Sequence, residues 1–291
     1  LAFELKGYKV AYLPGSVFEF NQISRVVGKL PTRDLFPYLV QSLFPKALFK
    51  RALNQLGVDV LITNSEYSSR YLQQYLDQRV IAIPPGRDSQ RQSAITRSDQ
   101  VASDLFVEGP FFVFLGPPLP IRGIEVLLDA YTSVADEDDM PSLLCLIRAD
   151  EHLDIDAAKA RYETKWPHHK ITYVWNSLSV SVLQDHLTKA QAVIMPFLIV
   201  PSEIPLAVYE AAGLGKIVVC TAPHGTGEFV SKFGITVPPG SKASLVEAMR
   251  ILKQRVNTAP NSDAIAAFRS LSEWSTVAFE WECVALRKCD T

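Results

Sequence analysis

Short apolar runs alternate with longer amphipathic stretches along most of this chain, and this alternation is the feature that most constrains its fold. Nine runs have the length and β-branched content of strands: 9–13, 58–63, 79–83, 111–116, 142–148, 170–175, 192–197, 216–221 and 235–238. Helical patterns separate most of them, over 37–56, 66–77, 123–135, 154–165, 179–190, 205–214 and 241–255. The runs are mostly apolar without strict alternation, as in strands covered on both faces. This order predicts an α/β fold of βαβ units around parallel sheets.

A polar stretch over 86–104 divides this pattern into two parts. It is rich in Ser, Gln, Arg and Asp and nearly free of large apolar residues, which is typical of a linker. We therefore predict a shortened N-terminal domain with its linker over 1–104 and a second domain over 105–265. Apolar residues at helical spacing further on predict a terminal helix within 266–291.

Composition and charge exclude several function classes. The 291 residues include 29 basic and 31 acidic ones, for a net charge of -2, whereas nucleic-acid-binding domains usually carry a clear basic excess. No apolar run is long enough to cross a membrane. The four cysteines show neither a disulfide framework nor a zinc spacing, so we expect a reducing, cytoplasmic location. His168, His169 and His186 have no ligand partner at metal spacing, and we predict no metal site.

One stretch, 36–53, suggests a surface role. Its apolar residues recur at helical spacing, Pro45 would kink the helix, and Lys46, Lys50 and Arg51 cluster near its end. Such a helix can make peripheral contact with an anionic membrane or with an acceptor lipid. The alternative is a core helix flanked by solvated cations.

The segment PSEIPLAVYEAAGLG, residues 201–215, is the most informative for chemistry. Ser202 can cap a helix that begins here, and Pro205 suits its first turn. The helix follows a strand, so its unpaired N–H groups would face the carboxyl edge of the sheet and could bind a phosphate. The alternative is a well-capped helix with Glu210 on the surface.

Two more strand-to-helix turns carry candidate residues. After the strand that ends at Gly116, the pair Arg122-Gly123 opens a helix, and the guanidinium could reach a phosphate over the sheet edge. The alternative is a turn arginine paired with a nearby acid. The third turn, His224-Gly-Thr-Gly-Glu228, is short and glycine-rich, and two glycines alone are weak evidence.

The order of these segments resembles the C-terminal domain of retaining GT-B glycosyltransferases, the glycogen-synthase-like and mannosyltransferase-like family. FLGPPLPIRG looks like that family's Gly-Arg…Lys-Gly loop, with Arg122 in place of the lysine and Pro117 in place of the arginine. PSEIPLAVYEAAGLG looks like its Glu-x7-Glu motif: Glu210 fits the second glutamate, Ser202 stands at the first, and Glu203 is one residue late. HGTGEFV looks like its Gly-Gly-x-x-Glu turn.

The resemblance covers about residues 50–290 and implies a GT-B-like fold of two Rossmann-like domains, the N-terminal one incomplete, with the terminal helix returning to it. It implies a hexosyltransferase that moves a sugar from a nucleotide-sugar donor to an unidentified glycan, lipid or protein acceptor. Retention is implied by the resemblance alone. We expect no cofactor, and no divalent metal if the helix dipole and Arg122 suffice to stabilise the diphosphate. The alternative is a non-catalytic accessory subunit in which a partner chain covers the short N-terminal domain.

The same resemblance assigns the expected site residues. Glu210 would hold the ribose, Arg122 and the helix start would stabilise the leaving diphosphate, and Ser202 or Glu203 would contact sugar hydroxyls. Arg122, Ser202 and Glu203 are the expected catalytic residues. Trp175 could stack on the base, although a core tryptophan is an equal reading. The whole expected donor-binding set is Gly116, Arg122, Gly123, Trp175, Asn176, Ser202, Glu203, Ile204, Pro205, Leu206 and Glu210.

Overall fold

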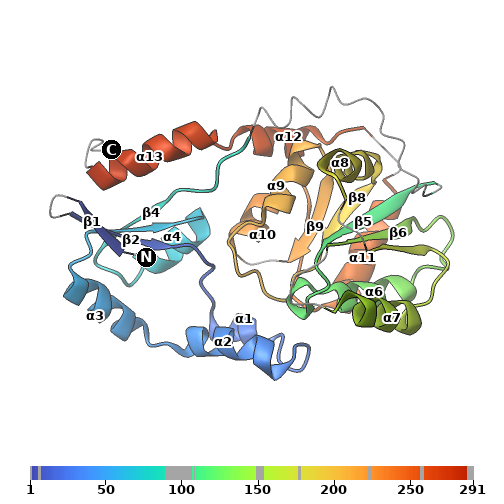
Figure 1. Ribbon diagram of the computed structural model, residues 1–291, viewed down its shortest axis with the longest axis horizontal. Coiled ribbons are helices and arrows are strands. Elements are labelled where there is room, and N and C mark those ends of the chain that lie inside the picture. Colours follow the sequence, from blue (N-terminus) through green and yellow to red (C-terminus); the bar gives the residue numbers. More distant parts are fainter. Residues whose placement is uncertain are drawn as a thin grey trace.

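The computed structural model describes residues 2–5, 8–88, 107, 109–148, 154–175, 178–221, 224–255 and 259–286. These residues form two sheets with helices packed around them, and the two units lie next to each other in Figure 1. Both sheets consist mainly of parallel strands, which confirms the predicted α/β fold.

The first unit contains a four-stranded sheet with the order β1-β2-β3-β4. Its elements are β1 (Ala2–Leu5), β2 (Tyr8–Leu13), α1 (Phe20–Ser24), α2 (Thr32–Leu43), α3 (Lys46–Leu56), β3 (Val60–Thr63), α4 (Glu66–Gln73) and β4 (Arg79–Ala82). Strands β2, β3 and β4 are parallel, but β1 is antiparallel to β2 and was not predicted. Leu5 pairs with Tyr8, and a connection of two residues can join only antiparallel strands.

The helical pattern predicted over 37–56 is two helices in the structure. Helix α2 ends at Leu43 and α3 begins at Lys46, with Phe44 and Pro45 extended between them. Proline has no N–H to donate and disfavours a helical conformation in the residue before it. Pro45 therefore ends one helix and opens the next instead of kinking a single helix.

The second unit is a six-stranded parallel sheet with the order β10-β9-β8-β5-β6-β7. Its strands are β5 (Phe111–Gly116), β6 (Ser142–Ile147), β7 (Ile171–Val174), β8 (Ala192–Met195), β9 (Ile217–Thr221) and β10 (Ile235–Val237). Its helices are η1 (Pro120–Arg122), α6 (Ile124–Thr132), α7 (Ile155–Lys165), α8 (Val180–Lys189), α9 (Leu206–Gly213), α10 (Gly225–Val230), α11 (Lys242–Lys253) and α12 (Ser262–Arg269). The chain runs from β5 to β7 and then returns to β8 on the other side of β5. The carboxyl ends of β5 and β8 are therefore the switch point, where open α/β sheets bind ligands.

The central strand β5 is buried on both faces. Phe112 and Phe114 pack into a cluster with Leu127 of α6, whereas Val113 packs on the opposite face with Val208 of α9. This two-sided burial explains why the strand reads as a continuous apolar run rather than an alternating one. It also holds the loops that follow β5 and β8 on a rigid support.

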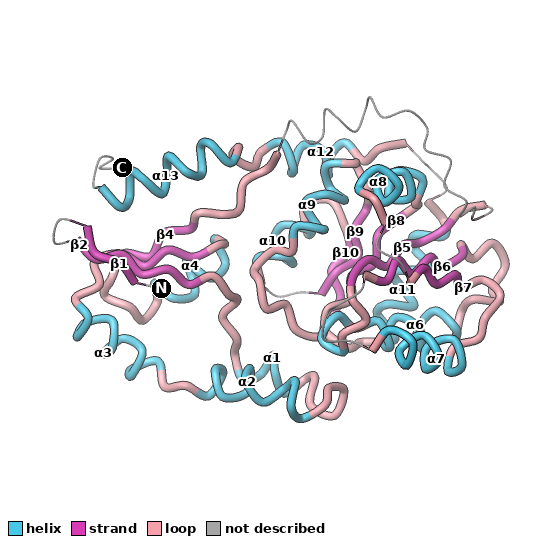
Figure 2. Tube along the Cα trace, in the orientation of Figure 1, coloured by secondary structure: helices cyan, strands magenta, loops and turns pink. Residues whose placement is uncertain are grey.

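A terminal helix, α13 (Trp274–Leu286), leaves the second unit and lies along the first (Figures 1 and 2). Val277 is buried with Val10 of β2, and the Trp281 ring meets the Tyr12 ring edge-on, with centroids 4.9 Å apart. Helix α12, by contrast, packs against α9 of the second unit. The predicted boundary at residue 104 lies outside the described residues.

The cysteines and the helix lengths bear on the expected environment of the chain. Cys145 and Cys220 are buried free thiols, but Cys283 is disulfide-bonded, which differs from the expected absence of disulfides. Within the described residues, every helix is too short or too polar to cross a lipid bilayer.

Candidate functional site

The loops that follow β5 and β8 touch each other at the switch point. The N–H groups of Leu198 and Ile199 both donate to the carbonyl oxygen of Ile121, at 2.8 and 3.2 Å. Gly123 has a φ of 74°, and a Cβ there would lie 1.9 Å from the carbonyl oxygen of Pro196. Only glycine allows this approach. The glycine predicted for the donor site thus fixes the short helix η1, and with it Arg122, against the β8 loop.

Arg122 is a partly buried cation without an acidic partner in the described part of the chain. Its guanidinium carbon lies 5.2 Å from the centroid of the Phe197 ring, and its buried Nε donates no hydrogen bond there. Burial, and then the positive charge of Arg148, lower the pKa of Arg122, although a guanidinium stays protonated in proteins. The alternative of a turn arginine in an ion pair is therefore not what the described residues form.

Arg148 is a second cation at the same edge, and the sequence analysis missed it. It directly follows β6, the strand next to β5, and its backbone N–H donates to the carbonyl oxygen of Gly116 at 3.3 Å. Its side chain is exposed and forms no ion pair with a described residue. Its place directly after the buried run SLLCLI was the available signal. Two neighbouring guanidiniums without a carboxylate form a site for an anion.

The segment Ser202–Leu206, which the sequence predicted to form part of the donor site, is partly exposed and partly buried. Ser202 is exposed, and so is Leu206, the first residue of α9. Ile204 is buried in the apolar cluster of the second unit, and the N-cap residue Pro205 is buried as well. A part of this corner is therefore core rather than an open anion site.

Glu203 holds the two units together. It is fully buried, and Ser65 Oγ donates to its Oε2 at 2.6 Å while Ser68 Oγ donates to its Oε1. The backbone N–H of Gly225 donates to Oε2 at 3.0 Å, and Thr226 Oγ1 donates to its carbonyl oxygen at 2.6 Å. Both carboxylate oxygens are thus occupied by protein donors. This position corrects the expectation that Glu203 contacts sugar hydroxyls.

Further polar contacts lie around this carboxylate. Arg70 of α4 forms an ion pair with Glu228 of α10, with 2.6 Å between Nη2 and Oε1. The backbone N–H of Ser16 donates to the carbonyl oxygen of Pro201 at 2.9 Å. We call the contacts of Glu203, Ser65, Ser68 and Gly225, with these two pairs, the interdomain joint.

His224, from the glycine-rich turn, is buried beside the joint. It has a φ of 88° and lies between the rings of Phe18 and Tyr67, with centroids at 5.2 and 5.8 Å. Its Nδ1 is buried and has no partner among the described residues. Burial lowers the pKa of His224 to about 4, so the ring is neutral at pH 7.

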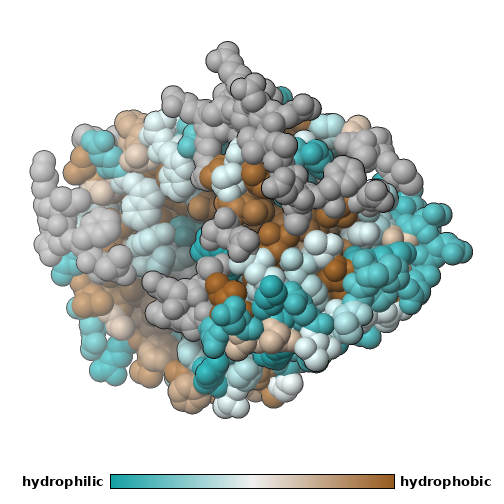
Figure 3. All heavy atoms as spheres, turned by 45° about the vertical axis from the view of Figure 1, so that its right-hand side comes forward, coloured by the Kyte–Doolittle hydropathy of each residue, from teal (hydrophilic) through white to brown (hydrophobic). Residues whose placement is uncertain are grey.

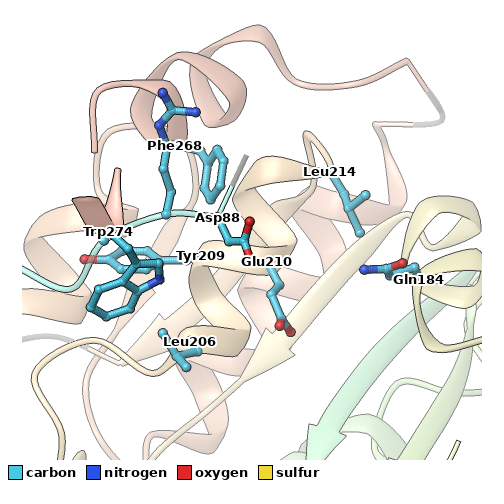
Figure 4. Close-up of a pocket in the computed structure, with 10 residues that line it drawn as sticks. Asp88, Gln184, Leu206, Tyr209, Glu210, Leu214, Phe268 and Trp274 are labelled. Carbon is cyan, nitrogen blue, oxygen red and sulfur yellow. The ribbon is translucent and has the colours of Figure 1, made fainter. Parts of the chain in front are cut away.

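Glu210 lies in the second turn of α9 and lines a pocket of about 130 Å³ (Figure 4). Leu206 of the same helix and Gln184 of α8 line it too, and Trp274 closes another side. Arg122 is not part of this lining. The structure therefore brings Glu210 together with Leu206 in this pocket, and it places Arg122 next to Gly123 in the loop that follows β5.

Trp175 follows β7 and packs on α7. Its ring is stacked on Tyr173 and tilted against Tyr162, each with centroids 6.0 Å apart, and its Nε1 donates to Glu163 Oε1 at 3.1 Å. These contacts favour the reading of a packed tryptophan over a free stacking platform. Asn176, also predicted for the donor site, lies outside the described residues.

One group of side chains has a metal-like arrangement. Asp136, His168 and His169 bring their ligand atoms within 4.8 Å of one another, and Asp136 is the acidic partner that the sequence spacing did not show. However, the N–H of Lys170 donates to His168 Nδ1, so the proton of a neutral ring lies on Nε2, 3.2 Å from Asp136 Oδ1. Nε2 then has no lone pair for an ion, and we assign no metal to the group.

Comparison with known proteins supplies the wider context. The family model described as "Glycosyl transferases group 1" matches residues 109–255, half of the chain. Sucrose-phosphate synthase from Thermosynechococcus elongatus is similar in structure, with 17% identity, a TM-score of 0.62, and coverage of 83% of this chain and 60% of that one. Anabaena HepE in complex with UDP-glucose has 15% identity, a TM-score of 0.57, and coverage of 81% and 66%.

A third similar structure is a UDP-forming α,α-trehalose-phosphate synthase from Burkholderia xenovorans, with 13% identity, a TM-score of 0.58, and coverage of 95% and 68%. A search of the curated proteins gave no match. At these identities the likeness shows a GT-B fold. This chain spans less than two thirds of the first two structures.

Proposed function

We propose, because this chain belongs to the group 1 glycosyl transferases, that it moves a sugar from a nucleotide-sugar donor to an acceptor hydroxyl. Such a transfer breaks the bond between the anomeric carbon and the diphosphate oxygen. A nucleoside diphosphate leaves with growing negative charge, so the transition state gains most from fixed positive charge beside that oxygen.

The observation that carries this proposal is the pair of cations at the switch point. Arg122 has a buried Nε without a partner, and Arg148 from the neighbouring strand lowers its pKa, while no described acid neutralises either. Planar guanidiniums bind phosphate oxygens in pairs and hold their charge at any physiological pH. Arg148 would supply the second cation at a site where Pro117 stands in place of the family's arginine.

The donor would extend from this cation pair towards α9. The carboxylate of Glu210 would accept hydrogen bonds from the ribose hydroxyls, the role that the Glu-x7-Glu resemblance implies. Exposed Ser202 remains a proposed contact to the sugar, whereas buried Glu203 no longer does. HepE was solved with UDP-glucose and the trehalose-phosphate synthase is UDP-forming, so uridine donors are the first to test.

Two finer features belong to this proposal, the first from the resemblance and the second from the charges at the site. We propose transfer with retention of the anomeric configuration, and transfer without a divalent metal. Two guanidiniums can provide the charge that a metal ion would otherwise place on the leaving diphosphate.

Calorimetric titration with UDP, UDP-glucose and other nucleotide sugars tests the donor site. We expect Arg122→Gln to lower donor affinity about 100-fold, because charge-assisted hydrogen bonds to the diphosphate are lost. Arg148→Gln and Glu210→Gln should each lower it about tenfold. Arg250→Gln is the matched control, since Arg250 is exposed and paired with Glu137, which precedes β6 on the amino-end side of the strands.

Turnover is measured as release of the nucleoside diphosphate over a panel of glycan and lipid acceptors, with and without a metal chelator. The chelator should leave the rate unchanged, and NMR of the product should show a retained anomeric centre. Failure of the chain to bind any nucleotide sugar, or equal losses in the Arg250 control, would contradict the proposal.

A further inference from the structure

The N-terminal unit has an apolar surface that faces solvent. It consists of Phe36, Val40, Leu43, Phe44 and Leu48, which are 60%, 48%, 58%, 52% and 50% exposed, and we call it the α2–α3 surface. Of the thirteen large hydrophobic side chains exposed in the described part of the chain, eight lie between residues 20 and 56. Figure 3 shows brown, apolar surface at the lower left, the side to which α2 and α3 belong in Figure 1.

The exposed apolar side chains are separate from the face of α2 that packs on the core. The inner side of α2 already packs: Leu35 is buried, and Tyr38 and Leu39 lie against the cluster around Phe18. The exposed residues of α2 follow a second stripe, at positions 36, 40 and 43, which is the spacing of one helical face. Helix α2 is therefore apolar on two faces, and the fold uses only one of them.

The same segment carries most of the local positive charge. Residues 25–51 include six basic residues, Arg25, Lys29, Arg33, Lys46, Lys50 and Arg51, but only one acid, Asp34. The rest of the chain has 23 basic and 30 acidic residues, from totals of 29 and 31. A locally cationic segment in an acidic chain attracts an anionic surface.

Several of these cations already have partners: Arg33 forms an ion pair with Asp34 at 3.5 Å, and Lys29 Nζ donates to the carbonyl oxygen of Gly240 at 3.0 Å. Lys50 forms an ion pair with Asp77 at 2.6 Å. Lys46 instead lies over the rings of Tyr71 and Tyr75, with Nζ 4.5 and 4.8 Å from the centroids. Arg51 is exposed on α3. Long cationic side chains beside apolar ones suit an interface between headgroups and acyl chains.

A hollow opens beside this surface. It measures about 350 Å³, and its lining includes Val40, Phe44, Phe49, Tyr71 and Lys46. Its lining is mostly apolar and aromatic, and its cation lies next to the rings. An acyl chain with an anionic headgroup fits this chemistry, whereas a charged soluble ligand would leave the apolar wall unused.

We infer that the α2–α3 surface binds an anionic lipid bilayer as a peripheral contact. The apolar side chains enter the headgroup boundary, and the surrounding cations face the lipid phosphates. This contact is independent of the donor site: vesicle binding requires neither Arg122 nor a nucleotide. Its failure would leave the proposed transfer reaction intact, and a failed donor titration would leave this contact intact.

Co-flotation with vesicles tests this inference on the full chain. Phosphatidylcholine vesicles are compared with vesicles that also contain phosphatidylglycerol. We expect binding only to the anionic vesicles, decreasing as salt is added. Phe36→Ser with Leu43→Ser should lower the partition coefficient at least tenfold, and Arg51→Gln should lower it about fivefold. Phe36, Leu43 and Arg51 are all exposed, so these substitutions should leave the circular dichroism spectrum and the unfolding midpoint unchanged.

The matched control is Phe279→Ser with Val180→Ser, two side chains that are 60% and 47% exposed on other elements. The control pair should bind vesicles as the wild type does. Equal binding to neutral vesicles, binding to neither kind, or equal loss in the control would overturn the inference. So would sedimentation showing a dimer that Phe36→Ser with Leu43→Ser dissociates, because a second copy would then cover the surface.

Discussion

Glu203 and Arg122 are both charged side chains that the fold buries fully or in part, and they differ in whether the protein supplies their hydrogen-bond partners. Glu203 is fully buried and receives hydrogen bonds from Ser65, Ser68 and Gly225, which come from both units. Arg122 is only partly buried, and neither a hydrogen bond to its buried Nε nor an acidic partner is found among the described residues. A charge with all its partners in place contributes to the fold, whereas one without them is available to a ligand.

The comparison also separates the two halves of the family motif. Glu203, one residue after the position of the motif's first glutamate, joins the two units and does not face an open site, whereas Ser202 at that position is exposed. The second glutamate, Glu210, lines a pocket. Variants of the joint should therefore change stability, and variants of the cation pair should change binding.

The largest effect is expected at the joint. Glu203→Ala should lower the free energy of unfolding by about 3 to 5 kcal/mol, because it leaves three buried donors without an acceptor. Denaturant titration measures it, and Glu247→Ala, at an exposed position on α11, is the control. A loss below about 1 kcal/mol would show that the joint is not holding the units together.

Low pH should weaken the same region through His224. Its pKa is about 4 in the folded state against an ordinary value of 6.5, so the unfolded chain takes up the proton first as pH falls. The contribution of His224 to the free energy of unfolding is therefore fully present above about pH 6.5. It should decrease by about 3 kcal/mol as the pH falls to about 4. His224→Gln should flatten this decrease in denaturant titrations at several pH values. Some slope should remain, because burial also lowers the pKa of His186.

At Arg122 we expect the opposite of Glu203: a small change in stability and a large change in donor affinity. Arg122→Met removes a poorly solvated charge, so the free energy of unfolding should stay within about 1 kcal/mol of the wild type or rise. Donor affinity should nevertheless fall about 100-fold, as for the glutamine variant. A large loss of stability with unchanged affinity would place Arg122 among the structural charges and remove the contrast with Glu203.

The smallest effect on stability is expected at Gly225, and it tests how closely the two units approach each other. A Cβ at Gly225 would lie 2.6 Å from Ser65 Cβ and 2.9 Å from Glu203 Oε2, so Gly225→Ala should cost about 1 to 3 kcal/mol. The double variant with Glu203→Ala should lose less than the two single losses together, because one clash is then relieved. Strict additivity would indicate that Gly225 and Glu203 do not act on the same contact.

Much of the second unit could be predicted from local pattern. The run 111–116 coincides with β5, and the runs near β6 to β10 differ from the strands by at most two residues at either end. Arg122 could be placed at the sheet edge because it follows a buried strand by a short turn. Arg148 obeys the same rule, but no motif of the resembled family drew attention to it.

The joint could not be predicted in this way. Ser65 and Ser68 lie 138 and 135 residues from Glu203 along the chain, and nothing in the local sequence pairs them. The antiparallel β1 and the break at Pro45 were missed for another reason: a short connection and one proline outweighed the periodic pattern around them.

The order of apolar runs, prolines and glycines along the chain was enough to determine where strands and helices form, because these choices depend on residues within one or two turns. Whether a buried charge has hydrogen-bond partners, by contrast, was decided only by the tertiary structure. Hydrogen-bond partners for a buried group come from whatever segment the fold brings within 3 Å, so the roles of Glu203 and Arg122 became distinguishable only in three dimensions.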